Sequence, residues 1–246
     1  MKKFSAFLLC AALAVCPAFA KKTSPPPGLS PVNLGSAASF AVFGASGVTS
    51  TGNTVITGYL GVYPIAGTAV TGFFSENAGG PGIVIGTIQD NDTALETTAA
   101  KHAFASLGIA IADAAGRPCT PCTLENAADL GGLTITPGLY ESGTTLALTG
   151  TLVLSGKGVY IFQIGSALTV NDGAEIILAN GATAADVFWQ VGTLAALGTG
   201  VAFEGTILAG AGVTMGSSTT LVGRALSQTD VTFIDDTVTL PPSPKK

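Results

Sequence analysis

A short internal repeat in the C-terminal third of the chain limits the folds that this sequence can adopt. The segment 205–215, GTILAGAGVTM, lines up with 223–233, GRALSQTDVTF, with a period of 18, and 191–197 lines up with 209–215 at the same spacing. Further upstream, 161–166 matches 188–193 at a spacing of 27, as if one coil carried an extra loop. Repeats of about 20 residues with short apolar segments and glycine corners are typical of solenoids. We therefore expect a mainly β chain, with three sides of about six residues in each coil of a triangular β-helix.

The alternation of side chains within each repeat predicts which residues point outward. In Val213-Thr214-Met215 and Val231-Thr232-Phe233, a hydroxyl lies between two large apolar residues. This period of two indicates a strand with one face in the core. Stacked coils would place one such residue from each coil in a column on the surface: Ala147, Thr169, Ala196, Thr214 and Thr232. The high β-propensity of threonine on a solvated face explains the same pattern without any function, so both interpretations stay open.

One segment departs from the β pattern. Residues 90–115 contain no proline and one glycine, and their apolar positions have a helix-compatible distribution. Asp90 or Asp92 is suited to cap the start of this helix, and Gly116 followed by Pro118 is suited to end it. The alanine-rich stripe of this segment predicts that the helix packs closely along one side of the solenoid.

The two ends of the chain are expected to lie outside the folded domain. Residues 1–20 have a lysine-containing start, an apolar stretch and the small-x-small site Ala18-Phe19-Ala20, so they predict a cleaved signal peptide and a secreted, extracellular protein. A lipoprotein signal is the alternative, but the bulky residues before Cys10 and Cys16 fit lipid attachment poorly. The proline-rich segments 21–31 and 241–246 are expected to be exposed, which leaves 32–240 as the folded domain.

The charge of the chain excludes two classes of partner. Only 10% of the residues are charged, against about 25% in an average domain. Loss of the two lysines of the signal peptide would take the formal net charge from −5 to −7. Nucleic acids and anionic membranes require clustered lysine and arginine, so neither is an expected partner. No apolar run after the signal peptide reaches the roughly 18 residues of a membrane-spanning helix.

The candidate reactive residues indicate structural roles. After removal of residues 1–20, two cysteines remain, Cys119 and Cys122, and His102 is the one histidine. Redox chemistry or half of a zinc site would also suit a CxxC motif, but there is no second pair, so an exported protein favours a disulfide. We therefore expect neither a metal nor a cofactor.

An enzymatic function is not expected either. Asp172 and Glu175 stand three residues apart, and Asp235 and Asp236 are adjacent, but neither pair has a basic partner at the same outward level. Turn chemistry explains Asn171-Asp-Gly, and Trp189 lies in an apolar strand that predicts a core position. We predict no catalytic residues.

Several segments, taken in order, resemble a known family. They are 33–44, NLGSAASFAVFG; 57–64, TGYLGVYP; 129–140, DLGGLTITPGLY; 158–165, GVYIFQIG; and 223–231, GRALSQTDV. The ordered set is similar to the microbial ice-binding (antifreeze) proteins of the discontinuous β-solenoid plus α-helix type. The resemblance implies a right-handed solenoid in which N-terminal coils, helix and C-terminal coils come together out of sequence order. One of its three faces would bind ice.

The resemblance also extends the predicted site. Carried over by position, the ice-binding face would contain Thr71 together with Ala147, Thr169, Ala196, Thr214 and Thr232, would be widened by Thr145 and Thr149, and would add Thr49. The expected function is adsorption of a monomer to the ice crystal surface, giving thermal hysteresis or inhibition of ice recrystallisation. An extracellular adhesion or polysaccharide-binding module is the alternative. Thr206, eight residues before Thr214, is expected on another side of its coil, and is a control position if that side is exposed.

Overall fold

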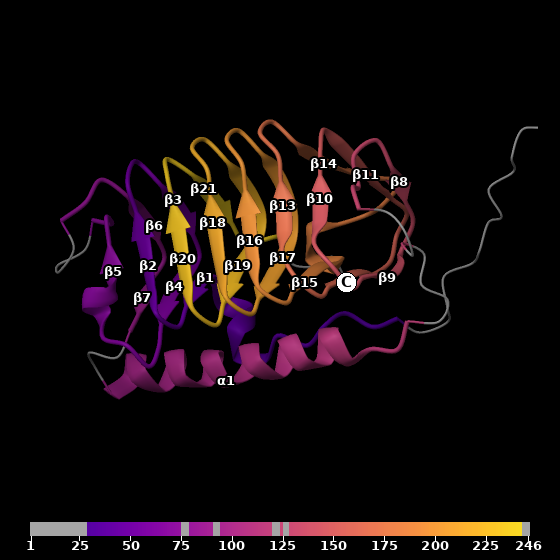
Figure 1. Ribbon diagram of the computed structural model, residues 1–246. Helices are drawn as coiled ribbons and strands as arrows, with labels where there is room; N and C mark the ends of the chain where they lie inside the picture. The colour runs from indigo at the N-terminus through magenta and orange to yellow at the C-terminus, as the bar shows by residue number, and fades with distance from the viewer. Residues whose placement is uncertain (1–28, 75–78, 91–93, 120–123, 125–127, 243–246) are drawn as a thin grey trace, which may run out of the picture.

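The protein is mainly β, with one long helix beside a stack of parallel strands (Figure 1). The computed structural model describes residues 29–74, 79–90, 94–119, 124 and 128–242. The predicted signal peptide 1–20 lies outside the described residues, as does most of the proline-rich segment that follows it. In the part of the chain that is described, no helix is long and apolar enough to cross a membrane.

Each coil adds strands to three rows, which we name by what covers them. The helix-covered face contains β9 (Gly138–Ser142), β12 (Tyr160–Ile164), β15 (Val187–Val191), the second halves of β17 (Ala202–Ala209) and β19 (Thr220–Ser227), β1 (Phe40–Gly44), β4 (Tyr59–Val62) and β7 (Ile88–Gln89). The first open face is a seven-stranded sheet of β10 (Leu146–Leu148), β13 (Leu168–Val170), β16 (Leu194–Leu197), β18 (Gly212–Met215), β20 (Asp230–Phe233), β2 (Gly47–Ser50) and β5 (Val70–Thr71).

The third row is the second open face. It contains β8 (Thr134–Ile135), β11 (Thr151–Ser155), β14 (Glu175–Ala179), the first halves of β17 and β19, β21 (Thr237–Thr239), β3 (Val55–Thr57) and β6 (Ile83–Ile85). Short 3-10 helices, η1 (Gly35–Ser39), η2 (Gly67–Ala69) and η3 (Ala184–Asp186), lie in the connections. Strands β17 and β19 pass from this row to the helix-covered face without a break. Gly205 makes that bend with a φ of 111°, and a Cβ at Gly223 would lie 1.8 Å from the Gly205 carbonyl oxygen, so close stacking at this corner requires glycine.

The repeat found in the sequence is the stacking repeat of the strands. Phe203 of β17 pairs with Leu221 of β19, and these residues are separated by the predicted spacing of 18. Ile161 of β12 pairs with Phe188 of β15, and these residues are separated by the predicted spacing of 27. The longer step comes from the connection between β14 and β15, which contains η3. Both spacings that the sequence predicts are therefore confirmed.

The coils do not stack in sequence order. Strands β1, β2 and β3 pair with β19, β20 and β21, so that Thr49 lies beside Thr232. In Figure 1 the yellow C-terminal strands β20 and β21 accordingly lie next to the indigo and purple N-terminal strands. The N-terminal coils therefore continue the stack that the C-terminal coils begin, as the family resemblance implies.

A ladder of aromatic rings fills the C-terminal half of the core. The ring centroids of Tyr140 and Phe162 are 5.3 Å apart, those of Phe162 and Trp189 are 3.9 Å apart, and those of Trp189 and Phe203 are 5.1 Å apart. Trp189 is fully buried, and its Nε1 donates a hydrogen bond of 3.0 Å to the Glu204 carbonyl oxygen. The predicted core position of Trp189 is therefore confirmed, and the polar atom of the ring has its partner.

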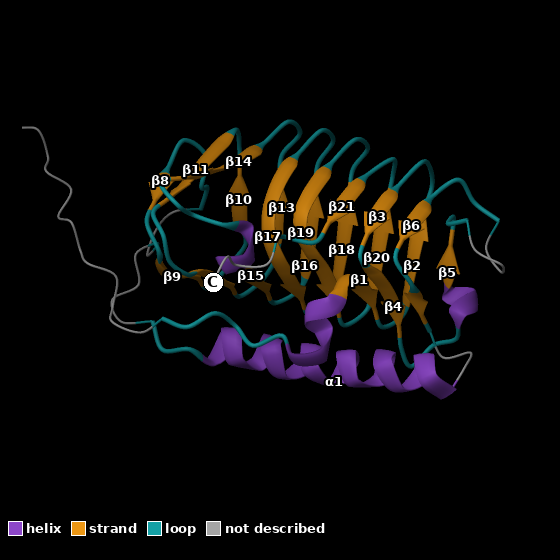
Figure 2. Ribbon diagram, turned by 180° about the vertical axis from the view of Figure 1, so that it is seen from behind, coloured by secondary structure: helices purple, strands orange, loops and turns teal. Residues whose placement is uncertain are grey.

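Helix α1 (Ala94–Gly116) lies along the helix-covered face and contacts β7, β17, β15 and β12 (Figure 2). It begins later than residue 90, and residues 91–93, which contain the predicted cap Asp92, lie outside the described part. The helix and the strands below form a second apolar cluster, which includes the buried residues Ala100, Ala103, Leu107, Ala110 and Ala114 of α1 and Ile161, Phe188, Leu208 and Leu226 of the face. A helix of 23 residues is about 34 Å long, and eight strands span roughly the same distance, so the helix matches the stack.

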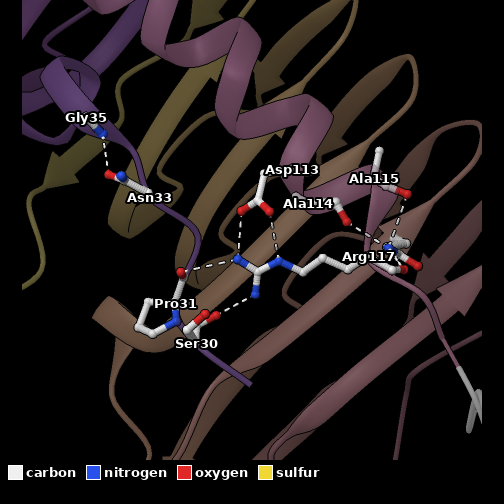
Figure 3. Close-up of polar contacts among 9 residues, drawn as sticks. Ser30, Pro31, Asn33, Gly35, Asp113, Ala114, Ala115 and Arg117 are labelled. Carbon is white, nitrogen blue, oxygen red and sulfur yellow. Dashed lines mark hydrogen bonds and ion pairs between the residues drawn. The ribbon is translucent and has the colours of Figure 1, made fainter. Parts of the chain in front are cut away.

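The C-terminal end of α1 is tied to both the stack and the N-terminal segment (Figure 3). The buried amide of Gln163 donates to the carbonyl oxygens of Ala114 at 2.7 Å and Arg117 at 2.9 Å. Arg117 forms an ion pair of 2.7 Å with Asp113 and donates to the Ser30 and Pro31 carbonyl oxygens. These bonds satisfy carbonyl groups that the end of a helix would otherwise leave without donors.

One expectation about exposure is wrong, and the condition attached to another is not met. Pro241 is buried, because it packs beside the N-terminal segment, whereas Pro242 is exposed. Thr206 does lie on a different row from Thr214, on the helix-covered face, but it is fully buried. Arg224 covers it, donating to the Thr206 hydroxyl at 3.3 Å and to the Ala38 carbonyl oxygen at 3.0 Å. Thr206 is therefore unsuitable as a surface control.

Candidate functional surface

One column of outward side chains crosses the first open face from end to end. Strand register places one residue of each strand in this central column, in the order Ala147, Thr169, Ala196, Thr214, Thr232, Thr49 and Thr71. The five residues expected from alternation and the two added from the family resemblance therefore lie in the same row. They come from seven coils and from both halves of the chain.

The central column is held in place by the residues on either side of it. Leu168 and Val170 flank Thr169, and Val213 and Met215 flank Thr214. All four flanking side chains are buried, with at most 2% of their surface exposed. Because inward and outward residues alternate along a strand, packing of the core fixes the backbone beneath each threonine. The sequence pattern thus sets the position of the exposed residue through its buried neighbours.

The column presents hydroxyl and methyl groups to solvent. Thr169 and Thr71 are exposed, and Thr49, Thr214 and Thr232 are half-buried by their neighbours. Thr71 donates a hydrogen bond of 3.2 Å to the Thr49 hydroxyl, whereas within the described part of the protein the hydroxyls of Thr169, Thr214 and Thr232 bond to no other group. These hydroxyls are available to water.

The two flanking threonines differ from each other. Thr145 and Thr149 are both exposed beside Ala147, as predicted. The hydroxyl of Thr149 donates to the Asp129 carboxylate, whose other oxygen accepts the backbone N–H groups of Gly131 and Thr149, both at 2.9 Å. Partial burial opposes ionisation of Asp129, but the bonds from Thr149 and the backbone outweigh it and lower the pKa. The Thr149 hydroxyl therefore uses its proton in the hydrogen bond to Asp129, whereas the Thr145 hydroxyl makes no such bond.

The small residues in the column leave an open depression in the first open face. It is lined by residues of β13 and β16 and the turns after them, among them Thr169, Asn171, Ala196 and Gly198. Ala196 occupies a column position where a threonine would add a hydroxyl, so the surface is lower there, and a Cβ at Gly198 would lie 2.4 Å from the Asp172 Oδ1 atom, so close packing of the turns excludes a side chain at that place. The face is therefore less regular than a ladder made of threonine alone.

Of the acidic residues noted in the sequence, Asp172, Asp235 and Asp236 lie in connections between strands, whereas Glu175 is the exposed first residue of β14. Asp172 accepts the Thr199 N–H at 2.8 Å, and Gly173 has a φ of 67°, as expected for turn chemistry. Asp236 is buried between the first and second open faces and accepts the Thr219 and Ile234 N–H groups at 2.9 and 2.6 Å. Its burial raises its pKa to about 6, and the two N–H groups oppose that rise. The carboxylates of Asp172 and Asp236 thus have structural hydrogen-bond partners in the backbone.

The other candidate ligands lie apart. His102 is exposed on α1, as its position in the predicted helix suggests. Among the side chains that the structure describes, no three His, Cys, Asp or Glu residues are placed to hold a metal ion. Cys119 is disulfide-bonded, and its predicted partner Cys122 lies outside the described residues, so that pairing stays a prediction.

Sequence reasoning missed a second set of outward residues, those on the second open face. Thr220-Leu-Val222 and Thr237-Val-Thr239 have the same alternation as the strands of the central column, with Leu221 and Val238 buried. The signal was therefore present in the sequence. The general abundance of threonine in the chain hides it, because threonine also occurs at many positions outside these strands.

Comparison with known proteins identifies one family. The family described as Ice-binding-like matches residues 42–239. An ice-binding protein of Flavobacterium frigoris (strain PS1) is 38% identical over 220 residues, which are 85% of this chain and 76% of that protein. An ice-binding protein of Nostoc sp. (strain HG1) is 39% identical over 207 residues, which are 82% of this chain and 71% of that protein.

Solved structures agree with the sequence matches. An ice-binding protein from an Arctic yeast has a TM-score of 0.80 with this chain at 32% identity, and the match covers 88% of this chain and 96% of that one. An ice-binding protein from an Antarctic biological consortium has a TM-score of 0.78 at 37% identity, covering 90% and 95% of the two chains. The segment that matches the family, 42–239, includes every strand of the first open face. The chain therefore belongs to the ice-binding-like protein family.

Proposed function

We propose that this protein is secreted and adsorbs to ice through the central column of the first open face, giving thermal hysteresis, inhibition of ice recrystallisation, or both. The proposal includes a monomer built as a right-handed triangular β-solenoid that binds neither nucleic acid nor membranes. The observation that carries it is the register that brings seven residues from seven coils into one row. The relatives named as ice-binding proteins support ice as the binding target.

The geometry of the column suits an ordered water lattice. Neighbouring strands place equivalent residues about 4.7 to 4.9 Å apart, and alternate residues of one strand are about 6.6 Å apart. Threonine has a restricted χ1 angle, which keeps its methyl and hydroxyl in fixed positions. The face can therefore hold waters caged over methyl groups and anchored by hydroxyl groups. A surface fixed before contact lowers the ordering cost that mobile, strongly hydrated lysine side chains would incur.

Adsorption would then act on ice growth without any chemical step. Ice between bound molecules has to grow as a curved front, and a curved front melts at a lower temperature than a flat one. The local freezing temperature falls, and exchange of water between small and large crystals slows. Nothing in this mechanism requires a cofactor, a metal ion or a catalytic residue.

The alternative of a polysaccharide-binding module is less well supported. Carbohydrate sites usually place aromatic rings on the surface for stacking. Here Trp189, Phe162 and Phe203 stack inside the coils, and Phe73 and Phe233 are also buried. These five rings belong to the core, and the described aromatic side chains that are exposed, Phe74 and Tyr59, lie outside the central column, which carries threonine and alanine.

Tyrosine substitutions test the proposal. Thr214→Tyr and Thr232→Tyr should each reduce thermal hysteresis at least about tenfold, equivalent to about 1.4 kcal/mol of adsorption free energy, because the ring holds the face away from ice. Ala112→Tyr, exposed on the outer side of α1, adds the same bulk elsewhere and should keep full activity. Circular dichroism of all three variants must match the wild type for the comparison to count. Wild-type hysteresis in both correctly folded column variants would show that this face is not the ice-binding surface.

A further inference from the structure

The second open face carries two further columns of outward residues. Strand register gives the first column as Thr151, Glu175, Ala202, Thr220, Thr237, Val55 and Ile83. The second column contains Glu204, Val222, Thr239, Thr57 and Ile85 in unbroken register. The buried residues between them, such as Leu221, Val238 and Ile56, point into the core. Five adjacent coils therefore present a pair of outward residues each.

These pairs are nearly free of charge. On β17, β19, β21, β3 and β6, eight of the ten outward residues are threonine, valine or isoleucine, and Glu204 is the charged one. Ile83 and Ile85 are 51% and 59% exposed. Among the described residues, the hydroxyls of Thr237, Thr239 and Thr57 have no hydrogen-bond partner. Apolar groups in regular rows on a protein surface gain free energy when a partner removes them from bulk water.

The partner must match a flat, neutral and periodic surface. Strands in register without a bulge give rows about 4.7 to 4.9 Å apart, and the two columns lie about 6.6 Å apart. The β-branched side chains have restricted rotamers, so the methyl and hydroxyl positions repeat from coil to coil. The first open face has this same lattice and this same chemistry. It is built from the same coils, with four residues between β18 and β19 and three between β20 and β21 turning the chain from one face to the other.

We propose that the second open face is a second ice-adsorption surface, which lets one molecule bind two ice planes of different orientation. The inference rests on the proposed function of the first open face. The two faces are held at a fixed angle because the strands of both belong to the same coils. A molecule at the edge between two crystal planes would therefore contact both. The half-covered Glu204 marks the end of this surface, and Ile83 and Ile85 lie at its other end.

The test is a comparison of ice planes bound by labelled protein. A single-crystal ice hemisphere grown with fluorescent wild-type protein should show two sets of labelled planes. The double variant Thr220→Tyr, Thr237→Tyr should lose one set and keep the other, and Thr214→Tyr should give the complementary pattern. The double variant Thr220→Lys, Thr237→Lys provides a second disruption, through charge and mobility instead of bulk, with the same expected loss. Ala112→Tyr serves as the control with added bulk on the helix.

Each outcome separates the two proposals. If the wild type labels no plane, the proposed function fails. If the wild type binds ice and both second-face variants, with wild-type circular dichroism, give the wild-type pattern, this inference alone is overturned. Complete loss of labelling by Thr214→Tyr would also overturn it, because the second face would then not adsorb by itself. A wild-type dimer that Thr220→Tyr, Thr237→Tyr converts to a monomer in sedimentation velocity would assign this face to self-association instead.

Discussion

The helix-covered face and the first open face are made by the same coils, but they differ in their outward residues. On the helix-covered face, Ile161, Phe188 and Leu208 point outward, and α1 buries them. The corresponding column on the first open face carries Thr169, Ala196 and Thr214, and no described element covers it. The strands pair in parallel on both faces, with one register shift, between β1 and β4, on the helix-covered face. The same strand stack thus supports both faces. The residues at the outward positions determine whether a face packs against α1 or stays open to solvent.

The largest change in stability is expected from a substitution in α1, which packs on the helix-covered face and not on the first open face. Leu107 is fully buried against the stack, so Leu107→Ala should lower the free energy of unfolding by about 2–4 kcal/mol through lost contacts and a cavity. Ile109, two residues along and 69% exposed, is the matched control, and Ile109→Ala should change stability by less than about 0.5 kcal/mol. Urea unfolding measures both values. Thermal hysteresis per folded molecule should be unchanged in each variant, and a loss in folded Leu107→Ala would mean that the helix contributes to the active surface.

A smaller effect should come from the bond network at the end of α1. Gln163→Leu removes the donors that satisfy the carbonyl groups of Ala114 and Arg117, at a cost of about 1–3 kcal/mol. Hydrogen exchange should become faster in the last turn of α1 than in its middle. The exposed Gln228 offers a control, since Gln228→Leu leaves this network intact. Uniform exchange rates along the helix in Gln163→Leu would show that the glutamine does not hold its end.

The smallest effect concerns Glu204, at the place where the second open face is partly covered by the η3 connection. Burial raises the pKa of Glu204 to about 7 from about 4.5. The folded state therefore binds this proton more tightly than the unfolded state, and stability should decrease as pH rises from about 4.5 to about 7. Because the side chain is only half-buried, solvent screening reduces the decrease to the order of 1–2 kcal/mol, and Glu204→Gln should remove it. Chemical unfolding at several pH values measures the slope.

One control variant and one other titrating group define the pH dependence of stability. Glu175→Gln removes the same charge from an exposed position on the adjacent strand β14 and should leave the slope unchanged. Asp236 contributes a similar decrease below pH 6, because burial raises its pKa to about 6. The Glu204→Gln variant should accordingly keep a smaller dependence on pH. An unaltered slope in Glu204→Gln would assign all of the pH dependence to other groups.

The parts of the fold that could be predicted are those set by local pattern. The repeat spacing and the alternation around Thr214 and Thr232 follow from short strands that bury every second residue, and each signal recurs along the chain. The helix was also predictable, because 23 residues without a proline have a composition unlike the coils. Composition does not choose the first residue of the helix, since Asp90 and Asp92 both suit a cap.

The remaining features depend on contacts between distant segments. Thr49 and Thr71 carry no clear repeat, and they join the column only because β2, near the start of the chain, pairs with β20, near its end. Thr206 has the appearance of a surface residue in its own strand, but Arg224 and the segment around Ala38 bury it. Pro241 is buried for a similar reason. Neither periodicity nor propensity contains information about such coverage.

The place of β21 in the stack has a consequence for biogenesis. This last strand lies between β19 and β3, in the middle of the row rather than at its edge. During synthesis, β1, β2 and β3 leave the ribosome first, yet the strands that join them to the rest of the molecule are made last. Nearly the whole chain must therefore be available before its two halves can join, and such non-local pairing slows folding. A chain whose translation stops before β19 lacks the strands against which β1, β2 and β3 dock, so its first coils have no edge on which to stack.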